Sequence, residues 1–465
     1  MRDKNAELLG NTNVKKALIT LSIPAMIGML VNASYNLFDS LFVGWGAGEL
    51  AIGGLTLAFP VQMIVMAVAL MIGIGGASVF SRAYGRNDQQ AMHNTLNTAV
   101  RIGVFSGIII SVIGLLTLTP MLNFFGATSE NIGFAQDYLG IILFGVTFQT
   151  MSMILNNFTR AEGRAKIAMF SMVIGTGLNI ILDPIFIFDW GLGLGVQGAA
   201  IATVISQVTA FSYITYHTLD EDSKLKITLT HFFKVDWVAL KDIIVIGLPT
   251  FVRNSLGAVL AILILRMIEH YSIPTDISMN QAIYGVINRV IMFIFMPGFG
   301  LVQGLSPIAG YNFGAKNWQR LVDVTSFATY ILMIYFIGGF LFIQFGAGII
   351  FNIFSSSNDA AFMENGARMF RIISIGFGLI SFQIVSGALY QAFGYAKRAM
   401  FISLSRQFIF FLPISFILTR IYGLDGLWYT FVVADVASGL LGLAMLLYEV
   451  KVLKKASDLM PVLNT

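Results

Sequence analysis

An acidic residue stands inside a stretch of the chain that is apolar and long enough to cross a lipid bilayer. Asp183 lies within residues 167–188, and Asn179 precedes it by four positions, so a helix places both side chains on one face. Pro184 follows directly, and its missing N–H frees a backbone carbonyl one turn earlier. A carboxylate in a bilayer costs about 2.5–3.5 kcal/mol on insertion scales, so its presence needs a reason.

A second polar stripe lies in the first apolar segment, where four side chains share one helix face at i, i+3, i+4 and i+7: Asn32, Tyr35, Asn36 and Asp39. Two stripes with one acid each predict a water-accessible cavity between helices. The alternative is that each acid pairs with an arginine or caps a broken helix. Acids inside membranes mark functional sites by default, which favours the cavity.

Polar side chains also recur at helical spacing in the fourth and eighth apolar segments. They are Gln149, Asn156 and Asn157 in the fourth, and Gln281, Tyr284 and Asn288 in the eighth. Both stripes could line the cavity, and hydrogen bonds between helices are the alternative. Other ionisable residues stand in apolar segments of the second half: Arg253, Arg289, Arg406 and Asp435. For these we expect structural pairing, for instance of Asp435 with an arginine.

The composition is that of a membrane protein. Hydrophobic residues make up 57% of the chain and charged residues 11%, against about 25% in soluble proteins. The absence of cysteine excludes disulfides, thiolate metal sites and cysteine nucleophiles. The polar start, residues 1–16, is not a signal peptide, so the first apolar segment is expected to direct its own insertion.

The fold class predicted is an all-α membrane protein with twelve transmembrane helices, because twelve apolar segments are each about 20 residues or longer. They are residues 17–43, 51–80, 95–119, 138–158, 167–188, 194–216, 243–268, 279–308, 321–353, 369–390, 399–419 and 424–448. With the N-terminus inside, most of the 28 Lys and Arg residues fall in inner loops, and the outer loops hold Arg420 and little else. This bias predicts a multi-pass membrane protein with both termini in the cytoplasm.

The chain repeats itself on either side of its longest polar break. Residues 160–170 and 391–401 are identical at seven of eleven aligned positions. An even number of segments in each half inserts both halves the same way up. The sequence therefore predicts two pseudo-symmetric six-helix bundles, residues 1–217 and 243–465, joined by a cytoplasmic connector, residues 218–242.

The chain resembles the multidrug and toxic compound extrusion (MATE) transporters over essentially its whole length, and within them the bacterial multidrug exporters. The matching motifs are Pro24, Asp39, residues 83–87, Asn157, residues 160–163, Asn179, Asp183-Pro184 and residues 195–203. The resemblance implies a coupling-cation site of Asp39, Asn157, Asn179, Asp183 and Thr203, and a bend of the first helix at Pro24. Family members of the vibrio type place coupling acids in the seventh and tenth spans, where this chain has none.

The expected function is secondary active efflux of apolar organic cations, drugs and dyes, in antiport with H⁺ or Na⁺ by a rocking motion of the two bundles. Na⁺ would find oxygen ligands at Asp39, Asn179, Asp183 and Thr203, so the sequence leaves the coupling ion open. An enzyme is not expected, because the four His are scattered and no nucleophile–base or HExxH pattern occurs. We expect no cofactor, contact with membrane lipid, no nucleic acid and a monomer. The alternative function is a lipid-linked oligosaccharide flippase of the same superfamily.

Overall fold

The protein is helical throughout the part of the chain that the computed structural model describes, residues 3–228, 236–355 and 359–463. In chain order the helices are α1 (Lys4–Gly10), α2 (Val14–Ala47), α3 (Glu49–Gly85), α4 (Gln89–Leu116), α5 (Leu118–Phe124), α6 (Ile132–Ala161), α7 (Ala165–Ile187), α8 (Gly195–Thr218), α9 (Trp237–Tyr271), α10 (Ile277–Gly314), α11 (Trp318–Phe354), α12 (Ala360–Ser374), α13 (Phe377–Phe393), α14 (Ala396–Leu404), α15 (Leu412–Tyr422) and α16 (Leu424–Leu463). A 3₁₀ turn, Pro274–Asp276, precedes α10, and a π-helical turn, Ser405–Phe411, joins α14 to α15.

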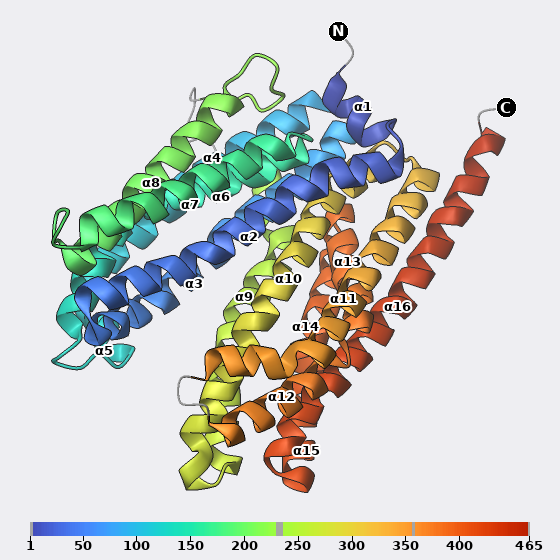
Figure 1. The fold of residues 1–465 in the computed structure, drawn as a ribbon. Helices are drawn as coiled ribbons and strands as arrows, with labels where there is room; N and C mark the ends of the chain where they lie inside the picture. The colour runs from blue at the N-terminus through green and yellow to red at the C-terminus, as the bar shows by residue number, and fades with distance from the viewer. Residues whose placement is uncertain (1–2, 229–235, 356–358, 464–465) are drawn as a thin grey trace.

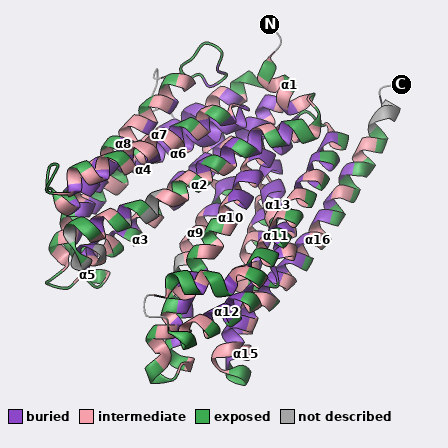
Figure 2. Ribbon diagram, viewed as in Figure 1, coloured by how far each residue is buried: buried purple, intermediate pink, exposed green. Residues whose placement is uncertain are grey.

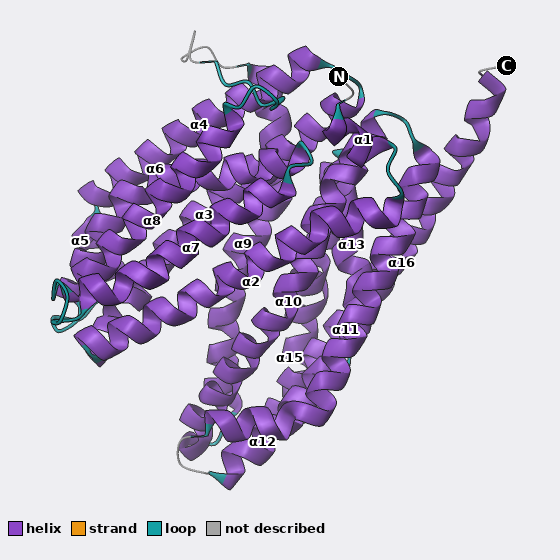
Figure 3. Ribbon diagram, turned by 45° about the horizontal axis from the view of Figure 1, so that its top comes forward, coloured by secondary structure: helices purple, strands orange, loops and turns teal. Residues whose placement is uncertain are grey.

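The helices form two groups that converge at one end and diverge at the other (Figure 1). Helices α2–α8 form the first group, on one side, and α9–α16 form the second group, on the other. Both chain termini lie at the converged end. The turned view shows the same long helices running side by side, linked by short loops (Figure 3). Buried residues lie between the helices and are densest toward the converged end (Figure 2).

The fold class predicted from the sequence is confirmed. Eleven helices of the described chain are long and apolar enough to cross a membrane, and the pair α12–α13 makes a twelfth if it is one span. The segment predicted at 369–390 is not one straight helix, because α12 and α13 meet at 49°. At the break Gly376 lies against Asp435 so closely that a Cβ would overlap the aspartate side chain. The absence of a side chain at 376 therefore allows α16 to pack directly at the bend.

The connector is shorter than predicted. Helix α9 begins at Trp237, so residues 237–242 are helical and not part of a loop. The Asp236 carboxylate caps α9 by accepting the N–H groups of residues 238 and 239. This cap sets the start of the helix six residues before the apolar segment that the sequence displays.

Basic residues also lie at the end far from the termini, where the sequence predicted almost none besides Arg420. Arg368 and Arg371 belong to α12, which lies at that end (Figure 1). Arg368 pairs there with Asp425, with Nη2 2.8 Å from Oδ1. The predicted bias is therefore weaker than stated: Arg371 was counted within the apolar segment 369–390, which runs into the amphipathic α12, and Arg368 was passed over in the loop before that segment.

Glycines bring the two groups of helices into backbone contact at the converged end. Gly75 of α3 and Gly247 of α9 face each other, and a Cβ on either would overlap a carbonyl of the other helix. Gly304 of α10 similarly lies against Ser22 of α2, whose hydroxyl donates to the Leu301 carbonyl at 3.2 Å. Small residues let helices approach this closely inside a bilayer, where packing rather than water exclusion holds them together.

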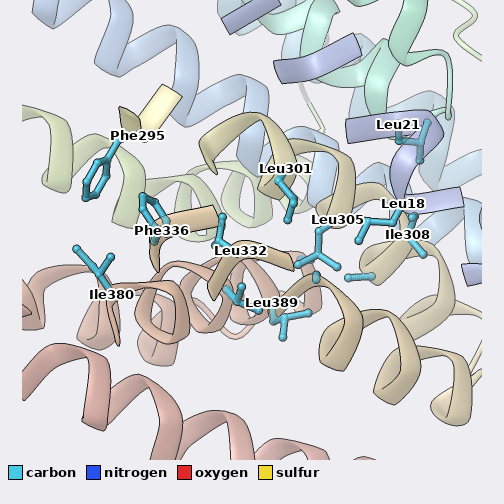
Figure 4. Close-up of a cluster of buried hydrophobic side chains, with 14 of the residues drawn as sticks. Leu18, Leu21, Phe295, Leu301, Leu305, Ile308, Leu332, Phe336, Ile380 and Leu389 are labelled. Atoms are coloured by element: carbon cyan, nitrogen blue, oxygen red, sulfur yellow. The ribbon is translucent and has the colours of Figure 1, made fainter. Parts of the chain in front are cut away.

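An apolar core fills the space beside these contacts. Leu18 and Leu21 of α2 lie next to Leu305 and Ile308 of α10 (Figure 4). All four are fully buried. The first helix of one group is thus packed along the second helix of the other, and any separation of the groups at this end must break that contact.

The short helix α1 closes the converged end. Asn312 and Arg320 of the second group donate to the Leu9 carbonyl at 2.9 and 3.1 Å. On the other side Asp3 accepts the Tyr84 hydroxyl at 2.8 Å and also caps α1. Burial alone would raise the pKa of Asp3, but the hydrogen bonds from Tyr84 and the helix N–H groups hold it below its ordinary value. The carboxylate is therefore charged at neutral pH, and its contribution to docking is lost only as the pH falls through that lowered pKa.

We expect Asp3→Ala to loosen α1. Because the chain has no cysteine and Leu9 is fully buried, a Leu9→Cys variant reports docking by its rate of maleimide labelling. Loss of an N-cap costs about 0.5–2 kcal/mol, so Asp3→Ala should speed labelling roughly 2- to 30-fold.

The matched control is Asp359→Ala, which removes the N-cap of α12 at the opposite end of the molecule. Labelling at position 9 should not respond to it. An unchanged rate in Asp3→Ala, or an equal increase in both variants, would contradict the role of Asp3.

Candidate cation site in the first group of helices

Three helices bring the predicted site residues together: Asp39 from α2, Asn179 and Asp183 from α7, and Thr203 from α8. Helices α7 and α8 pack along each other, and α2 packs along α7. Helix α7 continues through Pro184 to Ile187, so Asn179 and Asp183 keep the helical spacing that places them on one face. All four side chains are buried, Asp183 completely.

Asn179 is the centre of the hydrogen bonding. Its amide nitrogen Nδ2 donates to Asp183 Oδ1 at 3.0 Å and to Thr203 Oγ1 at 3.3 Å. One amide thus holds a carboxylate on its own helix and a hydroxyl on the next. This fixes the side-chain positions across the α7–α8 interface.

Three oxygen atoms of this site accept no hydrogen bond from the described part of the chain: Asp39 Oδ1, Asn179 Oδ1 and Asp183 Oδ2. Buried polar atoms are nearly always paired, and an unpaired one costs about 1–3 kcal/mol, more when it carries charge. The two carboxylates also repel each other through space. Unpaired oxygens on two interacting acids form a site that a proton or a small cation would satisfy.

Tyr138 completes the surroundings of Asp39, and sequence reasoning missed it. The Tyr138 hydroxyl forms a hydrogen bond with Asp39, and Gln62 Nε2 approaches the same hydroxyl at 3.5 Å. Tyr138 belongs to α6 and Gln62 to α3, so these contacts tie α2 to two more helices. The only sequence signal was a lone glutamine within the second apolar segment.

Asn157 and Asn156 form other contacts. Asn157 Nδ2 donates to the Met153 carbonyl at 2.8 Å and packs on Gly73 of α3. Asn156 Nδ2 donates to Ser152 O at 2.8 Å and reaches Ser171 Oγ of α7 at 3.3 Å. The Asn156 amide nitrogen thus joins α6 to α7, which is the alternative that the sequence left open, while its Oδ1 has no hydrogen-bond partner in the described chain.

The remaining predicted cavity residues make none of the hydrogen bonds described for this site. Asn32 is exposed, Gln149 and Gln281 are half-buried, and Asn288 is exposed. Tyr284 is half-buried, within electrostatic range of Arg406. The side chains of Tyr35 and Asn36 lie outside the described residues.

In the second group of helices the expected ion pair is present. Arg406 Nε lies 2.5 Å from Oδ1 of Asp435, which is almost fully buried, and the guanidinium also stands over the Phe295 ring. The pairing predicted for Asp435 is confirmed. Arg289 is exposed and Arg253 half-buried, and neither forms an ion pair within the described chain.

The site differs from a transition-metal centre. Among the described residues no three His, Asp or Glu side chains gather within reach of one ion. Two carboxylates with amide and hydroxyl oxygens are hard ligands, suited to H⁺ or an alkali cation.

Comparison with known proteins agrees with this architecture. A family model described as MatE matches residues 24–185 and 249–417. The chain is 26% identical over 445 residues to the multidrug export protein MepA of Staphylococcus haemolyticus, covering 95% of each chain.

Solved structures agree as well. One, titled an outward-facing conformation of a multidrug resistance MATE family transporter, is 27% identical with a TM-score of 0.89, and the match covers 97% of this chain and 99% of that one. Another, titled MATE in the bent conformation, is 28% identical with a TM-score of 0.88, over 98% and 99% of the two chains. The match of the family model to both halves shows that the chain belongs to the MatE family, the multidrug and toxic compound extrusion transporters.

Proposed function

We propose that the protein exports apolar organic cations across the bacterial cytoplasmic membrane in exchange for H⁺ or Na⁺. The observation that carries this proposal is the group of unpaired buried oxygens on Asp39, Asn179 and Asp183. Such a group is stable when a cation occupies it and costly when it is empty. That difference is what an exchanger needs in order to couple two binding events.

Exchange follows from charge at this site. With no cation bound, two carboxylates in a low dielectric attract an organic cation toward the first group of helices. An entering H⁺ or Na⁺ cancels that attraction and releases the drug. Moving one charge inward down the membrane potential supplies about 2.3 kcal/mol per 100 mV, enough to change drug affinity by more than tenfold.

The arrangement of the helices supports an outward-open state. The two groups converge at the end that holds both termini (Figure 1), and a solved structure titled outward-facing has the same fold. If the termini are cytoplasmic, the diverging end faces the outside. Transport would then be a rocking of residues 1–217 against 243–465 that separates the contacts between α2 and α10 and between α3 and α9.

A lipid-linked oligosaccharide flippase is the second candidate, and the charges argue against it. Arg406 is paired by Asp435, whereas Asp39 and Asp183 have no cation partner in the described chain. An anionic pyrophosphate lipid that entered the first group of helices would meet the two acids of this site. We therefore expect transport of monocationic dyes such as ethidium, measured in proteoliposomes, and no competition by anionic lipid-linked sugars. Transport confined to such sugars would replace this proposal.

Asp39→Asn and Asp183→Asn should each abolish gradient-driven ethidium efflux from proteoliposomes, because an amide cannot take up and release a cation. The assay is driven first by a pH gradient and then by a Na⁺ gradient, which identifies the coupling ion.

The matched control for both variants is Asp137→Asn. Asp137 is an exposed acid in α6, next to Tyr138, and efflux should be normal without it. Efflux at the native rate in the double variant Asp39→Asn, Asp183→Asn would remove the site from the coupling mechanism.

Pro24→Ala should slow coupled efflux more than it weakens drug binding. Helix α2 runs unbroken through Pro24, whose missing N–H leaves the backbone ladder weak at that point. Asp39 lies fifteen residues further, about 22 Å along the same helix, so a local bend can move its packing against α7. Drug affinity by fluorescence polarisation and efflux rate are measured on one preparation. Equal losses in both, or in neither, would exclude Pro24 from coupling.

A further inference from the structure

A cavity of about 630 Å³ opens between the start of α2 and the first half of α11 at the converged end. Its wall includes Lys15 from α2 and Arg320, Asp323, Phe327 and Tyr330 from α11. The four α11 residues recur every three or four positions, so they share one face of that helix. The cavity therefore lies across the junction between the two groups of helices.

The polar part of the cavity carries both signs of charge. The Lys15 ammonium stands 5.6 Å from the Phe327 ring and forms no ion pair with any described residue. Arg320 donates to the neutral carbonyls of Leu8 and Leu9 and forms no ion pair with a described residue, although the nearby Asp323 carboxylate acts on its charge. Asp323 is exposed, and its Oδ1 accepts one hydrogen bond, from Gln319 at 3.0 Å. Two cations and one carboxylate thus face a space large enough for a small polar group.

An exposed apolar stripe continues from each wall deeper into the span. On α2, Lys15 is followed at four-residue spacing by Ile19, Ile23 and Ile27, which are 45%, 50% and 43% exposed. These side chains are left uncovered by the protein, and they lie within a helix that is long and apolar enough to cross a membrane.

The stripe on α11 has the same form. Beyond Phe327 and Tyr330 it continues with Ile334, Ile337 and Leu341, which are 49%, 41% and 46% exposed. Each helix therefore presents a charged end and an apolar length in the same order. That order is the order of headgroup and acyl chain in a phospholipid.

We infer that this cavity binds a phospholipid with a primary-ammonium headgroup, phosphatidylethanolamine in type, that bridges the two groups of helices. Lys15 and Arg320 hold its phosphate, Asp323 holds its ammonium, and the acyl chains lie along the stripes of α2 and α11. The lipid belongs to the leaflet at the converged end, which is the cytoplasmic leaflet if the orientation given under the proposed function holds. Because it contacts both groups where they converge, its presence favours the conformation described here.

Asp323 is what selects the headgroup. A phosphatidylglycerol has no ammonium to pair with that carboxylate, and its phosphate would add a second negative charge nearby. A phosphatidylcholine carries a cation but no N–H group, so it cannot donate the hydrogen bond that the free carboxylate oxygen would accept. An ethanolamine supplies both charge and donor.

The test is native mass spectrometry of the detergent-purified protein, titrated with phosphatidylethanolamine, phosphatidylglycerol or phosphatidylcholine of identical acyl chains. The native protein should retain phosphatidylethanolamine best. Lys15→Gln should weaken binding of all three lipids about tenfold, the cost of one charge-assisted hydrogen bond. Asp323→Asn should weaken only phosphatidylethanolamine and remove its advantage over phosphatidylglycerol.

The matched controls are Lys454→Gln and Asp458→Asn. Both residues are charged and exposed, and both lie near the end of α16. They should leave lipid binding unchanged. Tyr330→Trp locates the lipid. Because the chain already holds five tryptophans, the readout is the quenching by phosphatidylethanolamine with brominated acyl chains that Tyr330→Trp adds to the quenching of the native protein, and this added quenching should be much smaller when Lys15→Gln is also present.

Equal retention of phosphatidylethanolamine and phosphatidylglycerol by the native protein would overturn the assignment. So would an equal loss of binding in the α16 controls. Lipid binding is measured here without transport, so its failure is separate from any failure of the cation-exchange proposal.

Discussion

A bilayer offers no hydrogen bonds to a buried polar atom, and this constraint governs the whole structure. The chain meets it by forming helices, which pair their own backbone groups, and by pairing most of its intramembrane side chains. Asn156 reaches Ser171, Ser22 reaches a carbonyl of α10, and Arg406 is paired by Asp435. Several buried amide and hydroxyl groups of the described chain also lack a partner, but the carboxylate oxygens without one are Asp39 Oδ1 and Asp183 Oδ2, and they belong to one site.

The two groups of helices differ in whether their buried acids have a cationic partner. In the second, Asp435 is neutralised by Arg406 beside a π-helical turn and is not free to exchange a cation. In the first, Asp39 and Asp183 lie near each other, and Asn179 and Tyr138 supply hydrogen bonds but no charge. The two halves therefore share the helical arrangement, but only the first has buried acids without a cationic partner in the described chain.

The proposed movement between the groups would have to break or preserve the contacts at the converged end. Backbone-to-backbone approach at Gly75 and Gly247 requires no side chain to be repacked when the helices separate. The small helix α1 adds polar contacts to both groups, and the α2–α11 cavity adds a place where lipid can do the same. The same helix α2 carries Pro24, Lys15 and Asp39, so the proposed rocking, lipid contact and cation exchange all involve one element.

The sequence by itself determined what depends on local spacing. Asn179 and Asp183 had to share a face because a helix repeats every 3.6 residues, and the apolar lengths determined where membrane spans could occur. Whether Asn156 faces a cavity or a neighbouring helix, whether 369–390 bends, and which arginine pairs with Asp435 depended on the packing of helices far apart in the chain. Tyr138 became a partner of Asp39 for the same reason. Only the tertiary structure decides such contacts, because helical periodicity specifies the direction of a side chain from its own axis but not which helix lies in that direction.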